Sequence, residues 1–374
     1  MTVEKSNDPR GNVYAGSKAC RQCHQSIYDA YVNSAHYNST RIASGKSISG
    51  SFDRGKNVFA FDADSKIVME NRDSGQYQVL YVNGKQKEAH PFDVAFGLRH
   101  AQTFAYWEGN KSFELPVSYF ITAGSWVASP GFSTTQANFK RFIGRTCYEC
   151  HSSFIESKLS QSPEGIEEVL DRATLVNGID CERCHGPAAN HVNFHLAFPE
   201  TKEAKYMVKS VLLTRQQKLD ACAVCHSGND KQKEISAFKF KMGDTLANFF
   251  LPWAPHRKTT GVFDVHGNQY QLLSQSKCFL QTKIMNCTTC HDPHTSVVTD
   301  LSLYSKKCIS CHEHIDHKSF AANEVSGKTF TTNCIDCHMP LQPSSIIAFQ
   351  QSGKDSKAAY LLRTHKIAVY NIKK

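Results

Sequence analysis

Fourteen of the fifteen cysteines in this 374-residue chain belong to one pattern, Cys-x-x-Cys-His, which occurs seven times. On one helical turn, residues i, i+3 and i+4 lie on the same side. Two thiols can therefore bond the two vinyl groups of one porphyrin while the histidine reaches its iron, which is the chemistry of a c-type haem site. The pattern predicts seven covalently bound haems c. The cysteines expected to attach them are Cys20, Cys23, Cys147, Cys150, Cys181, Cys184, Cys222, Cys225, Cys287, Cys290, Cys308, Cys311, Cys334 and Cys337.

The histidine that ends each motif is the expected proximal ligand of the iron. We number the motifs 1 to 7 in chain order, so that motif 1 begins at Cys20 and motif 7 at Cys334. Motifs 5 to 7 lie close together in the last quarter of the chain. The expected proximal ligands are His24, His151, His185, His226, His291, His312 and His338.

Paired cysteines also bind zinc or iron–sulfur clusters and form disulfides. Zinc ribbons and disulfides do not require a histidine directly after every pair, and four-thiolate clusters use other spacings. All seven pairs have that histidine, so haem attachment explains the pattern best. The remaining cysteine, Cys278, is better explained as a small buried hydrophobic residue than as a reactive thiol.

The chain has 18 histidines, and the motifs use seven, which leaves eleven for the distal side of the irons. Methionine is the usual competitor for that position, but the chain has only six methionines. Bis-histidine ligation is therefore expected. The predicted distal ligands are His36, His100, His191, His266, His294, His317 and His365, with His90, His195, His256 and His314 in reserve.

Spacing along the chain limits which iron each distal histidine can bind. Twelve residues of helix between His24 and His36 would span about 18 Å, too far for two ligands of one iron. His294 follows His291 by three residues, and His191 follows His185 by six, too closely to wrap around their own haems. We therefore expect these histidines to bind the irons of neighbouring motifs, which would fix the distance between haems.

The formal net charge of +9 does not indicate nucleic-acid binding. Seven haems would add about 14 propionates, and the oxidised protein would then carry a net charge of about +2. No basic run with interleaved aromatic residues is present either. The sequence has no apolar stretch long enough to span a membrane and no signal-peptide core at its start. Because haem attachment follows export, we expect a periplasmic or extracellular protein whose export signal was removed or is absent from this chain.

The local patterns predict a mainly α and irregular fold in which haems form the core. A helix is expected over residues 18–37, and others are expected to begin at Ser162 and Thr214, the latter with a capping box to Gln217. Alternating runs and turn signals at residues 73–75, 83–84 and 108–110 predict a small antiparallel β meander after the first haem site. The tail over residues 355–363 is expected to be helical. The expected domains are residues 1–50 with the first haem site, a β-rich insert over 51–140, and a six-haem domain over 141–374.

Several segments beyond the bare motifs resemble a family. The chain resembles multihaem c-type cytochromes related to the tetrahaem cytochromes of ammonia oxidisers, the octahaem hydroxylamine oxidoreductases and the pentahaem nitrite reductases. Among them it is most similar to secreted relatives that often accompany tetratricopeptide repeats. The matching segments are residues 19–36, FGLRH at 96–100, LPVSY at 115–119, CERCHGP at 181–187 with HV at 191–192, QSKC at 275–278, CHDPH at 290–294, and 334–340.

This resemblance implies close pairs of bis-histidine haems that relay electrons outside the cytoplasm. The chain departs from the family in having no Cys-x-x-Cys-Lys site, so the lysine-ligated catalytic haem of the nitrite reductases is absent, and no 34-residue repeat follows. We therefore expect an electron carrier rather than an enzyme. Its partners would be redox proteins, including other multihaem cytochromes or further copies of itself.

Two other functions remain open at this point. The first is a reductase or oxidase of a small nitrogen or sulfur species, which would need one haem with an open sixth position. The second is a subunit of an extracellular cytochrome filament with haems stacked across subunits. The spare histidines do not decide between these functions, because their number does not show how many bind iron.

Overall fold

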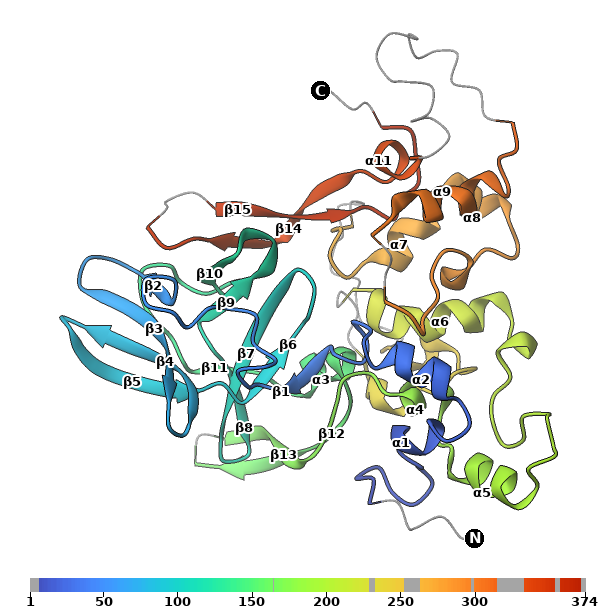
Figure 1. The fold of residues 1–374 in the computed structure, drawn as a ribbon, viewed down its shortest axis with the longest axis horizontal. Coiled ribbons are helices and arrows are strands. Elements are labelled where there is room, and N and C mark those ends of the chain that lie inside the picture. The colour runs from blue at the N-terminus through green and yellow to red at the C-terminus, as the bar shows by residue number, and fades with distance from the viewer. Residues whose placement is uncertain are drawn as a thin grey trace. The chain divides into compact units, whose positions relative to one another are not determined.

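The computed structural model describes residues 7–163, 165–228, 233–251, 263–296, 299–314, 333–353 and 357–370. The chain forms two compact units. Unit 1 comprises residues 1–208, 236–241 and 347–359, and unit 2 comprises 209–235, 242–346 and 360–374. Each unit is described separately below (Figure 1).

A four-stranded antiparallel sheet occupies the N-terminal half of unit 1. Its β3–β4 and β4–β5 connections are tight turns at the predicted positions, and Asn83 and Gly84 both adopt the positive φ that a two-residue hairpin requires. The predicted turn at residues 108–110 likewise joins two antiparallel strands. The strands of this sheet are β2 (Val58–Ala60), β3 (Ser65–Arg72), β4 (Gly75–Val82) and β5 (Lys85–Pro91).

A second, seven-stranded antiparallel sheet belongs to the same unit. Its main path runs β1-β6-β7-β8-β11, while β9 pairs with β7 and β10 pairs with β9. The strands are β1 (Thr40–Ile42), β6 (Val94–Phe96), β7 (Ala101–Glu108), β8 (Lys111–Glu114), β9 (Val117–Phe120), β10 (Ser125–Ala128) and β11 (Arg141–Phe142).

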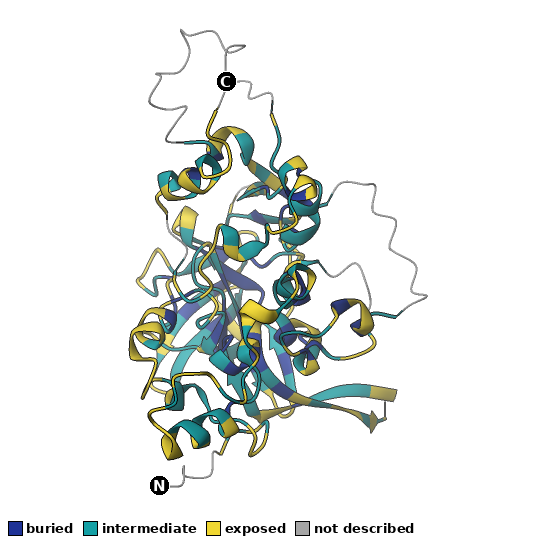
Figure 2. Ribbon diagram, turned by 90° about the vertical axis from the view of Figure 1, so that its right-hand side faces the viewer, coloured by how far each residue is buried: buried dark blue, intermediate teal, exposed yellow. Residues whose placement is uncertain are grey.

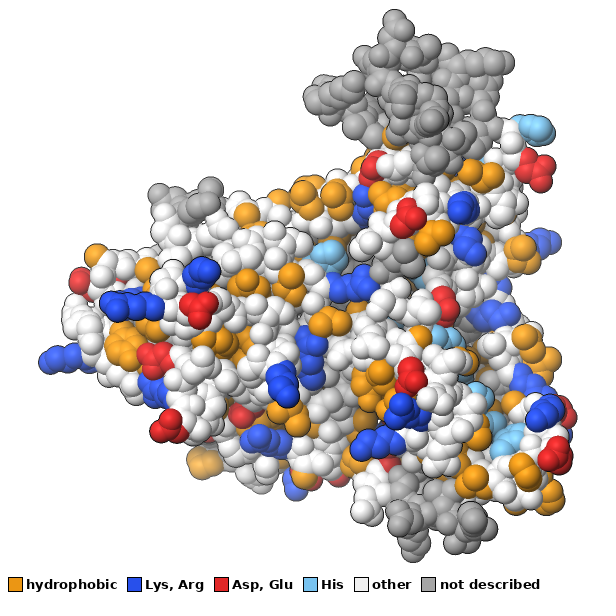
Figure 3. Space-filling model, viewed as in Figure 1, with side chains coloured by type: hydrophobic (Ala, Val, Ile, Leu, Met, Phe, Trp, Pro, Cys, Tyr) orange, Lys and Arg blue, Asp and Glu red, His pale blue; other side chains and the backbone are white. Residues whose placement is uncertain are grey.

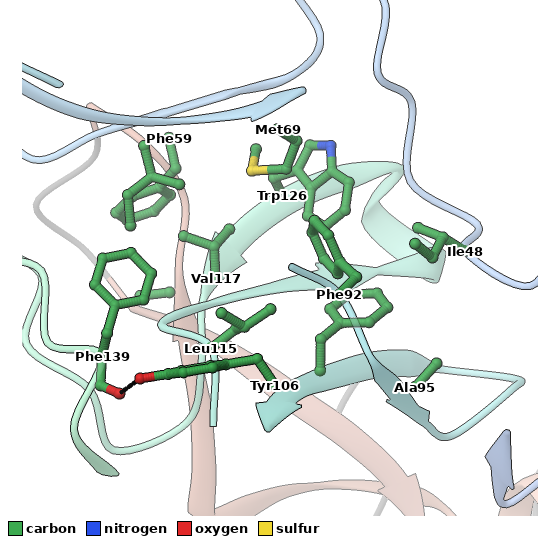
Figure 4. Packing of buried hydrophobic residues seen from close by; sticks show 13 residues of the cluster. Ile48, Phe59, Met69, Phe92, Ala95, Tyr106, Leu115, Val117, Trp126 and Phe139 are labelled. Carbon is green, nitrogen blue, oxygen red and sulfur yellow. Dashed lines mark hydrogen bonds between the residues drawn. The ribbon is translucent and has the colours of Figure 1, made fainter. Parts of the chain in front are cut away.

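The two sheets enclose a large aromatic core (Figure 4). Inward-facing residues of β2 and β3 meet those of β6, β7, β9 and β10, as alternating strands with one buried face require. Trp126, Phe92 and Phe104 pack on one another, and the Tyr106 hydroxyl donates a 2.8 Å hydrogen bond to the carbonyl of Phe139. Ordinary aromatic and aliphatic side chains therefore fill this core.

The rest of unit 1 combines a long hairpin with short helices. The hairpin, β12 (Ser152–Ser162) and β13 (Gly165–Asn177), runs from motif 2 to motif 3. A second cluster of buried residues, including Tyr148, Ile155 and Leu170, lies at its base. The helices are α1 (Ser17–Cys20), α2 (Gln25–Tyr31), α3 (Arg145–His151), α4 (Cys181–His185), α5 (Ala189–Ala197), η1 (Ile121–Ala123) and η3 (Ala237–Lys239).

Unit 2 is built mainly from short helices, with few fully buried side chains such as Leu219, Ala223 and Leu272. Figure 2 shows that buried residues are concentrated on strands, whereas many helical segments are coloured intermediate or exposed. The helices of this unit are η2 (Ser210–Leu212), α6 (Arg215–His226), η4 (Leu246–Phe249), α7 (Gln269–Ser274), α8 (Lys277–Gln281), η5 (Cys287–Thr289), α9 (Leu301–Ile309) and α11 (Ile335–His338). A last hairpin, β14 (Leu341–Gln350) and β15 (Lys357–Arg363), contributes residues to both units.

The predicted fold class, a mainly α and irregular fold with only a small β meander, is wrong. The described residues contain 15 strands in four sheets, and the largest hydrophobic core lies between two of those sheets. The motifs themselves need only one helical turn each, so seven haem sites do not require long helices. Period-2 alternation in the first 140 residues was the stronger guide to the fold.

Three predicted helices also differ from the structure. The first is broken, since α1 ends at Cys20 and α2 begins at Gln25. At Ser162 the Ser-Pro signal marks the tip of the β12–β13 hairpin, because the same residues favour turns. Residues 357–363 form β15, since pairing with β14 overrides the helical propensity of Ala, Leu and Lys. The capping box of Thr214 and Gln217 is confirmed at the start of α6.

Candidate haem sites

Each Cys-x-x-Cys-His motif forms one helical turn. Motifs 2, 3 and 4 end the helices α3, α4 and α6. In the other four motifs, the histidine N–H donates to the carbonyl of the first cysteine at 2.8 Å (motif 1), 3.0 Å (motif 5), 2.9 Å (motif 6) and 3.0 Å (motif 7). This i to i−4 hydrogen bond brings the two sulfurs and the imidazole to one side of the turn.

The donor set fits haem c and does not fit the alternatives. All fifteen cysteines are free, so none of the motifs forms a disulfide. Within the described ranges no group of three or more His, Cys, Asp or Glu side chains could hold a metal ion by itself. Zinc and iron–sulfur sites need three or four such ligands converging on one point. When bound, haem would supply reversible one-electron chemistry of its iron, while the chain supplies the thiols and the imidazoles.

The first cysteines of motifs 1 and 3 are in direct contact, and so are those of motifs 4 and 5. The Cys20 and Cys181 thiols hydrogen bond, which lowers the pKa of Cys181 and raises that of Cys20. Cys222 and Cys287 form the same contact, and it lowers the pKa of Cys287. Motifs 1 and 3, and motifs 4 and 5, are therefore neighbours.

Motifs 5 to 7 form a continuous series in unit 2. The thiols of Cys308 and Cys334 also hydrogen bond, and burial is the main cause that raises the pKa of Cys308 to about 11. Cys290 of motif 5 interacts electrostatically with Cys311 of motif 6 and with the unpaired Cys278. Motif 6 therefore has motif 5 and motif 7 as neighbours.

Hydrogen bonds orient three of the candidate imidazoles. Nδ1 of His191 donates to the carbonyl of Lys205 at 2.8 Å, and Nδ1 of His338 donates to the carbonyl of Ala368 at 2.9 Å. Nδ1 of His226 donates to the side-chain oxygen of Gln269 at 3.3 Å. A metal-binding histidine typically uses its second nitrogen in this way, because the bond fixes the tautomer and leaves Nε2 for the metal.

In two pairs of imidazoles, the ring centres are as far apart as those of two axial ligands of one iron. The ring centres of His24 and His191 are 6.4 Å apart with a 17° angle between the planes, and those of His291 and His365 are 6.2 Å apart at 32°. A metal–imidazole bond is about 2 Å long, and a ring nitrogen lies about 1 Å from its ring centre. Two imidazoles on opposite sides of one iron therefore have centres about 6 Å apart, as both pairs do.

The histidines around motifs 4 and 5 are held in their neutral form. Burial, together with the neighbouring His291 and His226, lowers the pKa of His365 to about 4. Burial likewise lowers the pKa values of His226, His291 and His266. The neutral imidazole is the form that binds a metal ion.

The structure also describes four other predicted distal ligands, whose surroundings differ from one another: His36, His266, His294 and His100. His36 is exposed after α2, and its carbonyl accepts the N–H of Ile179, two residues before motif 3. His266 interacts electrostatically with His226 of motif 4. His294 is partly exposed and lies 3.4 Å from Asp292.

His100, the fourth of these predicted distal ligands, is exposed directly before β7. His317 lies outside the described residues, as does the reserve His256.

Two reserve histidines in unit 1 differ from each other. His90 packs between Tyr106 and Phe139, and its Nε2 lies 3.1 Å from Glu88, so its ring already has partners in the sheet region. His195 follows His191 by one turn of α5, with ring centres 4.6 Å apart. Its Nε2 is buried without a hydrogen-bond partner, which makes it the nearest alternative to His191.

Sequence reasoning missed the two middle residues of motif 3. Attachment chemistry leaves these positions free, so no pattern marks them. Both are buried, Glu182 at 3% and Arg183 at 9% exposure. The Arg183 guanidinium donates to the carbonyl of Ala237 at 2.8 Å and to that of Glu149, inside motif 2, at 3.4 Å. Motif 3 is thereby tied to motif 2 as well as to motif 1.

The surface gives little sign of another kind of site. Most of the histidine side chains visible in Figure 3 lie over helical segments, interspersed with hydrophobic ones. The larger of the two best-formed pockets, about 430 Å³, is lined by charged residues that already form ion pairs, such as Lys111 with Glu167 at 2.6 Å. In the part of the chain that the structure describes, no helix is long and apolar enough to cross a membrane.

Comparison with known proteins agrees with this chemistry. Residues 99–186, which contain motifs 2 and 3, match the family described as cytochrome c554 and c-prime. Together with the seven motifs, this match defines the chain as a multihaem c-type cytochrome that binds haem c. Its fold is similar to the crystal structure of outer cell wall cytochrome OcwA, with a TM-score of 0.57 and 15% identity over 95% of this chain and 79% of that one. No curated protein matches the chain.

Proposed function

We propose that this protein transfers electrons through seven covalently bound haems c. The observation that carries the proposal is the axial spacing of the two imidazole pairs, 6.4 Å for His24 with His191 and 6.2 Å for His291 with His365. An iron with two histidine ligands has no open position for a substrate. Such an iron can exchange electrons but cannot bind a small molecule without losing a ligand.

In this proposal the haems are ligated across motifs. The iron of motif 1 takes His24 and His191, and the iron of motif 5 takes His291 and His365. His191 follows motif 3, so the segment of motif 3 completes the site of motif 1. The remaining distal ligands that we propose are His36, His100, His266, His294 and His317. We also propose that the segment 141–374 holds six of the seven haems.

The contacts between motifs support a route for electrons within each unit. In unit 1 the cysteine contact between Cys20 and Cys181 supports close haems 1 and 3, and the Arg183 contact to motif 2 supports haem 2 as their neighbour. In unit 2 the cysteine interactions support the series 4, 5, 6 and 7. Electrons would pass between adjacent haems without any movement of the chain.

We further propose that the protein works outside the cytoplasm, in the periplasm or beyond it. Thioether attachment to Cys-x-x-Cys-His takes place after export, and the name of the similar solved structure places that protein at the outer cell wall. The partners would be other redox proteins, including multihaem cytochromes.

The test is to count the haems and to determine the ligation of their irons in the purified protein. A pyridine haemochrome assay with intact mass should give seven haems per chain. Electron paramagnetic resonance of the oxidised protein should then show only low-spin ferric signals. A high-spin signal in the wild type that disappears on adding cyanide or nitrite would instead indicate an open haem and an enzyme.

A further inference from the structure

Glu182, the first of the two middle residues of motif 3, contacts three backbone N–H groups in two segments that belong to site 1. Its Oε1 accepts the backbone N–H groups of Ala15 at 2.9 Å and Ala188 at 2.8 Å. Its Oε2 accepts the N–H of Gly16 at 2.8 Å. The carboxylate is 97% buried, so these bonds do not compete with water.

Those three N–H groups lie at the starts of the two segments that carry the ligands of site 1. Gly16 is the N-cap of α1, whose turn continues through motif 1 to His24. Ala188 is the N-cap of α5, which presents His191 one turn later. One carboxylate therefore holds the proximal and the distal segments of the same site.

The carboxylate itself is fixed by charge. Arg10 lies 3.5 Å from Glu182, 2.6 Å from Asp180 and 2.8 Å from Asp8, and all four side chains are at most 8% exposed. Three carboxylates around one guanidinium keep a net negative charge at this point, which suits the partly positive backbone N–H groups at the helix starts. An apolar side chain at this position would leave those N–H groups without acceptors.

We propose that Glu182 is a positioning residue that sets the separation of the two axial ligands of haem 1, His24 and His191. This inference rests on the proposed function, because it assumes that these two imidazoles bind one iron. Glu182 contacts neither imidazole and acts only through the segments that carry them. One direct backbone bond, from the N–H of Ala189 to the carbonyl of Val13 at 3.0 Å, joins the same two segments and should preserve their association when Glu182 is changed.

Two substitutions of Glu182 should give graded effects. In Glu182→Gln one oxygen remains and can still accept from Ala15 and Ala188, while the amide NH2 cannot accept from Gly16. In Glu182→Met all three acceptor contacts are lost at similar side-chain volume. The matched control is Glu149→Gln, a buried glutamate in motif 2 whose carboxylate contacts Ser236 at 2.6 Å and Arg145 at 3.3 Å.

The experiment is electron paramagnetic resonance of the oxidised, fully haem-loaded proteins. We expect Glu182→Met to retain seven haems but to convert up to one iron per chain from low-spin to high-spin. Glu182→Gln should shift the low-spin g-values of one haem with a smaller high-spin signal. Glu149→Gln should leave the signals of haem 1 unchanged. Added imidazole should restore the low-spin signal of Glu182→Met, because it can replace a displaced ligand, whereas it would not repair a misfolded protein.

The inference is overturned if both Glu182 variants give the wild-type spectrum with seven haems, or if Glu149→Gln changes haem 1 as much as they do. If Glu182→Met does not accumulate as a folded protein, Glu182→Gln decides by the same measurement. Failure of the proposed function looks different. In that case replacement of both His191 and His195 would leave every iron low-spin, or the wild type would lack a haem at Cys20 and Cys23.

Discussion

Replacement of His191 by alanine should convert one iron in seven from low-spin to high-spin. The size of the effect follows from the structure, because His191 faces a single proximal histidine, His24, at 6.4 Å between ring centres. The two cysteines that attach this haem lie in another segment of the chain. The haem should therefore stay bound while its iron loses one axial ligand.

The assay is electron paramagnetic resonance with double integration of the high-spin signal against total haem. We expect one high-spin iron per chain in His191→Ala and none in the wild type. Added imidazole should return that iron to the low-spin state. His90→Ala serves as the control, since His90 already packs on Tyr106 and Phe139 in the sheet region and should not affect any iron.

His195 is the one residue that could mask this result, because its ring lies 4.6 Å from that of His191. If it replaces the missing ligand, the single variant will stay low-spin and the double variant His191→Ala/His195→Ala will not. Spectra without a high-spin iron in both variants would refute the assignment. They would show that the 6.4 Å pair is a packing contact and not a ligand pair.

Three further predictions concern other parts of the chain. Burial raises the pKa of Glu114 to about 7 despite the nearby Arg141. The free energy of unfolding should therefore be highest below the ordinary glutamate pKa and fall by up to about 3 kcal/mol as pH rises through 7. Glu114→Gln should remove this slope in denaturant titrations at several pH values. Leu115→Ala should lower the unfolding free energy of the sheet region by about 2–5 kcal/mol, because Leu115 is fully buried. An unchanged denaturation midpoint would contradict the packing described for that core. Replacement of Cys334 and Cys337 by serine should leave six haems by mass and lower the melting temperature, whereas seven remaining haems would exclude motif 7 as an attachment site.

The attachment sites proposed here could be predicted from the sequence because they are local. Two cysteines and a histidine within five residues share one helical turn wherever that turn occurs, and the structure contains such a turn at all seven motifs. The capping box at Thr214 and the hairpin turn at Asn83 and Gly84 are local features of the same kind. Such signals depend on neighbouring backbone groups and not on the rest of the fold.

Predictions from the sequence were wrong where one local signal is compatible with two kinds of secondary structure. Ser162 and the proline after it can begin a helix or a turn, and here they close a hairpin. Residues 357–363 have helical propensity but lie beside β14, so strand pairing decides their structure. The size of the sheets was underestimated because seven haem motifs suggested a core made of cofactors.

The sequence by itself determined that this chain binds haem c, and it predicts where each haem is attached, because covalent attachment depends on residues that are adjacent in the chain. Only the tertiary structure decided which motifs are neighbours and which spare histidine faces which proximal one. His24 and His191 are 167 residues apart in sequence, and their 6.4 Å separation depends on the segments packed between and around them. The buried contacts of Glu182 with Ala15 and Gly16 belong to the same class, since these partners lie far from it in the chain.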